Sequence, residues 1–199
     1  MFNLKNLVLF VIAGFFSFGG LAHAATTTTY HFGSLLSGSV VPANFHFADL
    51  IAVDNEDGNW SFTLNTLPAF ATTFGSSAFL GSMAVDRTIG SLPTTANVSG
   101  GVTSVGVSNG SGPLGDFDFR YTFGQGADRL IGGESVSWTS AGLPSGVFAN
   151  GQLALHVQRI GPDDESVWIS PVPEPETYAM LLAGLGLLGF AVRRRKTEA

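Results

Sequence analysis

The sequence predicts an all-β protein with the architecture of an antiparallel β-sandwich or jelly roll. Short segments rich in β-branched and aromatic residues recur about every 8–12 residues, separated by Gly- and Pro-containing turns. Several segments alternate apolar with polar side chains, as strands that bury one face do. Between the two ends of the chain no segment sustains a 3.6-residue apolar period.

The first half of this β-rich region centres on a hairpin signal, Asp57-Gly58. Residues 60–65 alternate large apolar with polar side chains, which predicts a half-buried strand after that turn. Residues 33–38 are expected to break the first strand, and 66–89 fit either two short strands or a turn of helix. The remaining expected segments are strands within 26–32 and 40–53 and a turn at 54–59.

The second half opens with a Gly- and Ser-rich stretch, 98–115, which predicts loops around one short strand at 102–107. Residues 116–123 have the cleanest alternation in the chain, with four aromatic residues on one face. Further strands are expected at 134–139, 153–158 and 167–169, separated by turns at 124–133, 143–146 and 162–165.

Composition excludes several classes of function. The chain has no cysteine, so it has neither disulfides nor thiol chemistry. Between residues 25 and 170 four arginines stand against twelve acidic residues, a net charge of −8. Such a region offers no basic surface for nucleic acid or for an anionic membrane, and nucleic acid is therefore not expected as a partner.

Residues 1–24 read as a secretory signal peptide. Lys5 is the only charged residue of this segment, an apolar run follows at 7–18, and Ala22-His23-Ala24 is a small-x-small cleavage site. Signal peptidase is therefore expected to cut after Ala24.

The C-terminal tail has three parts in a fixed order: a Pro-rich linker, an uncharged apolar run at 178–192 and a basic stop. The apolar run has 15 residues, short of the roughly 20 of a comfortable membrane span, although flanking side chains can extend it. Four consecutive cations would hold its end on the cytoplasmic side of the inner membrane. The length and charge pattern of this tail also fit a permanent membrane anchor. The linker is Val172, Pro173, Glu174 and Pro175, and the stop is Arg193, Arg194, Arg195 and Lys196.

These residues resemble the PEP-CTERM sorting signal. The resemblance implies an exported protein of a Gram-negative, exopolysaccharide-producing bacterium, whose tail is processed by the membrane protease exosortase. The tail would then be a removable address, comparable to the hydrophobic tail of a GPI signal. The expected division is a signal peptide at 1–24, a β-sandwich domain at 25–171 and the sorting tail at 172–199. A second, partial likeness lies at 47–51, which resembles the F-x-D-x-F motif of one PEP-CTERM subfamily but has Ile51 at the last position.

No catalytic constellation stands out. Ser108 lies in a formal G-x-S-x-G sequence, but its Gly/Ser-rich flank lacks the following helix of a nucleophile elbow. Asp116 and Asp118 are spaced suitably for a glycosidase pair, although a solvated strand face explains them as well. His31, His46 and His156 have no zinc-binding spacing, so no metal site and no cofactor are expected from them.

Two further features leave an alternative open. The acids around the 54–59 turn fail the EF-hand pattern, yet an irregular calcium site using Asp163, Asp164 or Glu165 is conceivable. Trp60, Trp138 and Trp168 would stack on sugar rings if exposed. The leading expectation is a non-enzymatic, exported protein of the cell envelope or extracellular matrix, associated with exopolysaccharide. The alternative is a lectin-like module, with or without calcium.

Overall fold

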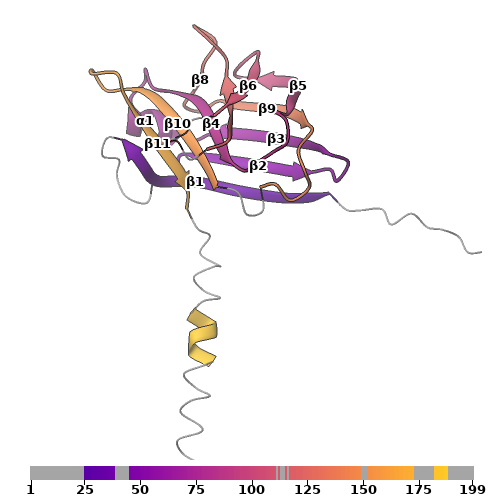
Figure 1. The fold of residues 1–199 in the computed structure, drawn as a ribbon. Helices are drawn as coiled ribbons and strands as arrows, with labels where there is room; N and C mark the ends of the chain where they lie inside the picture. Colours follow the sequence, from indigo (N-terminus) through magenta and orange to yellow (C-terminus); the bar gives the residue numbers. More distant parts are fainter. Residues whose placement is uncertain are drawn as a thin grey trace, which may run out of the picture.

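The body of the protein is one continuous antiparallel sheet, seen in the computed structural model (Figure 1). The structure describes residues 25–38, 45–110, 112, 115, 117–148, 152–172 and 182–187. A short helix, α1 (Pro68–Phe74), lies between β3 and β4 in the chain. The strands are β1 (Thr26–Gly38), β2 (Ala48–Asp54), β3 (Asn59–Thr66), β4 (Phe79–Asp86), β5 (Thr94–Gly100), β6 (Val105–Asn109), β7 (Phe119–Phe123), β8 (Leu130–Ile131), β9 (Ser135–Ala141), β10 (Gln152–Ile160) and β11 (Glu165–Pro171).

The sheet curls until its two ends meet. Its strand order is β5-β9-β3-β2-β1-β11-β10-β4-β7-β6, with β8 paired to β4 off this path. The outermost strands approach each other, and the Thr95 hydroxyl on β5 donates a hydrogen bond of 2.6 Å to the Val105 carbonyl at the start of β6. The antiparallel all-β prediction is confirmed, but the strands form one nearly closed, barrel-like sheet instead of two separate layers. Curling protects edge backbone groups that would otherwise be open to pairing.

The predicted hairpin is present between β2 and β3. Its turn has Gly58 at φ +79°, a conformation that glycine adopts without steric cost, and the Asn59 amide donates to Asp57 Oδ1 at 2.9 Å. Asp54, at the end of β2, is buried, and its carboxylate accepts from the amides of Glu56 (2.8 Å) and Gly146 (2.9 Å). This carboxylate therefore ties the hairpin to a distant loop and is satisfied by protein donors.

Aromatic side chains fill the interior of the curled sheet. Trp138 and Phe62 stack with ring centroids 4.9 Å apart, and Tyr121 packs beside both. The Tyr121 hydroxyl is paired with Ser140 Oγ at 2.8 Å, as a buried phenol requires. Trp60 is only 3% exposed, so it and Trp138 are core residues.

The α1 helix occupies the region that was compatible with either strands or a helical turn. Pro68 stands in its first turn, where a missing amide hydrogen is harmless. Phe70 and Phe74 pack their rings against Phe47, which precedes β2. The helix thus covers one part of the core with two phenylalanine rings packed against a third.

Several element boundaries differ from the sequence prediction. The first strand does not break at 33–38, because β11 pairs with that part of β1 and tolerates register shifts there. The last three residues of β5, 98–100, lie where a loop was expected, and the strand expected at 102–107 is β6, a few residues later. Phe117 does not continue the β7 face: it packs with Ala84 and Ala154 in a small cluster outside the main core.

The two ends of the chain contribute little to the described structure. The signal segment, including Ala22 and Ala24, lies outside the described residues. Residues 182–187 of the expected membrane segment are helical, and the rest of 178–192 is outside the described part. Among the described residues, no helix combines the length and apolar character needed to cross a membrane.

Candidate functional site

The start of the sorting tail is fixed to the sheet. Val172 follows β11 directly, and its amide donates a hydrogen bond of 2.7 Å to the His31 carbonyl on β1. The other predicted tail residues lie outside the described residues: Pro173, Glu174, Pro175, Arg193, Arg194, Arg195 and Lys196. The tail therefore leaves the domain beside His31.

Three polar side chains meet at this same place. His31 lies on β1 between Tyr30 and Phe32, both of which pack against the core, so the imidazole points to the outer face. Asp49 is directly opposite His31 in the β1–β2 ladder and likewise lies between two core residues. His46 approaches from the segment before β2.

A glycine allows this approach. A Cβ built on Gly33 would lie 2.0 Å from the carbonyl oxygen of Phe45, a distance that no real side chain could occupy. The backbone before His46 therefore lies tightly against β1 only because residue 33 lacks a side chain. This contact brings His46 beside His31, with ring centroids 5.0 Å apart and planes at 83°.

The two imidazoles converge on one carboxylate oxygen. His31 Nδ1 lies 2.6 Å and His46 Nε2 lies 2.5 Å from Asp49 Oδ1. The three side chains are partly open to solvent, with exposures of 43%, 47% and 22%. Within the described residues this is the one group of three or more histidine and carboxylate side chains arranged to hold a metal ion.

Sequence spacing could not reveal this group, because His31 and His46 are 15 residues apart and meet through strand pairing. A weaker signal was available: both histidines stand between aromatic residues, in Tyr30-His31-Phe32 and Phe45-His46-Phe47. On β1 this pattern directs the polar residue, His31, to the outer face. The Asp49 carboxylate belongs to the F-x-D-x-F-like segment, in which Phe47 is buried.

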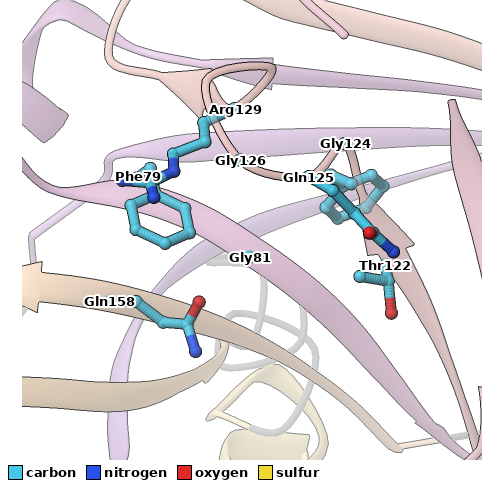
Figure 2. A pocket seen from close by; sticks show the side chains of 9 residues that line it. Phe79, Gly81, Thr122, Gly124, Gln125, Gly126, Arg129 and Gln158 are labelled. Carbon is cyan, nitrogen blue, oxygen red and sulfur yellow. The ribbon is translucent and has the colours of Figure 1, made fainter. Parts of the chain in front are cut away.

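A second feature on the outer face is a shallow hollow of about 340 Å³ over β4, β7 and β10 (Figure 2). The guanidinium of Arg129 lies over the Phe79 ring, 4.5 Å from its centroid, a favourable cation–π distance. Figure 2 shows Gln158 on the same side of the hollow and Gln125 and Thr122 on the other. Within the described residues, no carboxylate forms an ion pair with Arg129.

The third histidine, His156, is on the same face but has a different environment. Its ring stacks on Trp168 with centroids 4.3 Å apart and planes at 7°. Burial, and secondarily the positive charge of Arg120, lower the pKa of His156 from 6.5 to about 4. This imidazole is therefore neutral at physiological pH and packs as an aromatic ring.

The remaining candidates from the sequence are not brought into a common site. Ser108 lies within β6, and its Oγ accepts from the Arg120 guanidinium at 3.1 Å. Asp116 is outside the described residues, and Asp118 borders a separate small hollow. Asp164 pairs with Arg159 at 3.3 Å.

Comparison with known proteins bears on the tail and on the fold separately. Residues 171–196 match the PEP-CTERM protein-sorting motif. A solved structure described as "pH-induced modulation of Streptococcus parasanguinis adhesion by Fap1 fimbriae" aligns with 74% of this chain and 95% of its own, at 12% identity and a TM-score of 0.45. A likeness at this level transfers no activity. None of the curated proteins matches the sequence.

The sorting motif indicates a class of protein: exported, held in the membrane of a Gram-negative bacterium before processing, and a substrate of exosortase. The F-x-D-x-F subfamily is not confirmed by this match, which covers only the tail.

Proposed function

We propose that the chain is a non-enzymatic surface protein that exosortase releases from its membrane anchor, and that it then resides in the cell envelope or exopolysaccharide matrix. The observation that carries this proposal is the complete tripartite tail within the matched segment 171–196. Signal peptidase and exosortase are the two processing partners.

The position of the tail supports removal without damage to the domain. Pro171, at the end of β11, still pairs with Phe32 of β1, and Val172 makes the last described contact with the sheet. A cut within Pro173-Glu174-Pro175 would leave all eleven strands of the sheet in the mature protein. The strands that build the described sheet therefore all precede this cut.

The non-enzymatic part of the proposal rests on the environment of the candidate residues. Among the described residues the Ser108 hydroxyl is paired with Arg120 and not with a histidine, and Asp54 accepts hydrogen bonds from two backbone amides. Nucleophilic catalysis needs a base within hydrogen-bond reach of the nucleophile.

Intact mass of the protein from an exosortase-positive strain and from an exosortase-deleted strain tests the processing. We expect the full C-terminus only in the deleted strain and a chain ending near residues 172–175 in the other. The same full-length C-terminus in both strains would refute exosortase processing.

A lectin-like role is the second candidate, and the Arg129–Phe79 hollow favours it. Amide, hydroxyl and guanidinium groups around an open depression suit the hydroxyls and carboxylates of acidic sugars. Trp60 and Trp138 do not contribute, since both are buried, which leaves Trp168 as the partly exposed tryptophan.

Binding of the purified chain to a panel of acidic polysaccharides tests this candidate, with and without a calcium chelator. Arg129→Gln should weaken binding about tenfold or more if a sugar carboxylate pairs with the guanidinium. Arg87→Gln is the matched control, because Arg87 is exposed and does not line the hollow. Equal binding by both variants, or no binding by the native chain, would exclude the hollow as a sugar site.

A further inference from the structure

The group formed by His31, His46 and Asp49 is suited to more than hydrogen bonding. Two imidazole nitrogens and one carboxylate oxygen all lie within 4.8 Å of one another. We propose that these three side chains form a binding site for a divalent transition-metal ion, with zinc as the reference ion, at the point where the sorting tail leaves the domain.

The geometry is close to that of a coordination shell. Zinc binds imidazole nitrogen and carboxylate oxygen at about 2.0–2.2 Å, so tetrahedral ligand atoms lie about 3.4 Å apart. The observed separations from Asp49 Oδ1, 2.6 and 2.5 Å, are hydrogen-bond distances. Small side-chain rotations would open the group by less than about 1 Å, and the exposed positions of the side chains permit them.

The donor set selects the class of ion. Imidazole favours zinc, copper, nickel and iron, whereas calcium takes six to eight oxygen ligands and magnesium keeps several waters. Only one carboxylate is present in this group, so calcium has too few oxygen ligands here. The exposed side of the group leaves coordination positions for water or for a ligand from another molecule.

The surrounding backbone holds two of the three ligands in place. His31 is fixed by the ladder to β2, which sets it opposite Asp49, and by the Val172 amide on its carbonyl. The third, His46, is brought in by the close approach of Phe45 to Gly33. Asp49 Oδ1 accepts hydrogen bonds from both rings, and a metal ion would be bound by each imidazole in the tautomer whose proton lies on the other ring nitrogen.

A bound ion would connect β1, β2 and the segment before β2 next to the tail junction. Binding to the folded state alone raises the melting temperature with metal concentration. For this chain we expect a rise of about 5–10 °C at zinc concentrations near 100 times Kd.

The test is zinc binding by the full chain, purified in detergent without a polyhistidine tag. Equilibrium dialysis with metal analysis should give one zinc per chain. His31→Gln, His46→Gln and Asp49→Asn should each weaken zinc binding about 100-fold or more, since even loss of a ligand's supporting partner costs up to that amount. His156→Gln is the matched control and should bind zinc as the native chain does, because His156 is engaged with Trp168.

The His46→Gln variant should keep the native fold, because His46 precedes β2 and is 47% exposed. A loss of zinc binding in this variant would then report the lost ligand and not unfolding. Its circular dichroism and its melting temperature in chelator should equal those of the native chain. Substitution by cobalt gives a second readout, since visible absorption reports its coordination by nitrogen and oxygen. Zinc binding that is absent in the native chain, unchanged in the three variants, or lost equally in His156→Gln would overturn the proposal. These outcomes do not depend on exosortase processing.

Discussion

The outer face of the sheet holds histidines in two places, and their surroundings give them opposite chemistry. His31 and His46 are partly exposed and direct ring nitrogens toward the Asp49 carboxylate. His156 lies flat on Trp168, and burial lowers its pKa to about 4. The first pair offers nitrogen ligands to an ion, while the second site uses the imidazole as packing surface.

The difference comes from the neighbours and not from the strands. His31 and His156 follow the same strand alternation, and His46, which precedes β2, also lies between two residues that pack on the core. The Asp49 carboxylate lies within hydrogen-bond distance of ring nitrogens of both His31 and His46, whereas burial and the Arg120 charge favour the neutral ring of His156. A histidine on a strand is therefore a ligand or a packing residue according to what lies across the ladder.

Gly33→Ala should disrupt the first site most strongly. The new methyl group would collide with the Phe45 carbonyl, so β1 and the segment carrying His46 must separate. We expect a loss of about 1–3 kcal/mol in the free energy of unfolding, together with weaker zinc binding. Urea denaturation in chelator and zinc dialysis measure the two effects. Gly106→Ala, where nothing lies within 4 Å of the new Cβ, should change neither.

Trp168→Ala should make the surroundings of His156 more like those of His31 and His46, with an imidazole open to solvent. Removal of the stacked indole exposes His156, so its pKa should rise from about 4 toward 6.5. A titration of the His156 ring signals by NMR measures this change. Trp168→Phe should keep the stack and the low pKa, and Arg120→Gln should raise the pKa less, because charge is the smaller cause. A larger effect from Arg120→Gln would reverse the assigned order of causes.

The pH dependence of the unfolding free energy tests the same difference between His156 and the other two histidines, and the expected effect is smaller. The pKa of His156 is about 4 in the folded chain and 6.5 in its ordinary state, so the unfolded state binds more protons between these values. This contribution to stability is complete above pH 6.5 and is lost as the pH falls toward 4. His156→Gln should reduce the dependence of the unfolding free energy on pH in that window. Arg87→Gln should leave it unchanged.

Strands could be predicted from the sequence where side-chain alternation and turn residues within the segment determine them. β3 and β9 alternate buried with partly exposed residues along their length, and the Asp57-Gly58 hairpin joins β2 to β3 as expected. The first strand was predicted too short, because its second half is stabilised by β11, whose paired residues lie 129 or more positions away in the chain. Phe117 was placed on the same face as Phe119, Tyr121 and Phe123, because alternation alone cannot show where β7 begins.

The sequence by itself determined the all-β class and the sorting motif, because both depend on short-range order: side-chain alternation, turn residues and the tripartite tail. Only the tertiary structure decided that the strands form one curled sheet and that His31, His46 and Asp49 meet. The physical reason is that ladder register and the Gly33–Phe45 contact join residues distant in the chain. No local spacing encodes such a meeting of side chains.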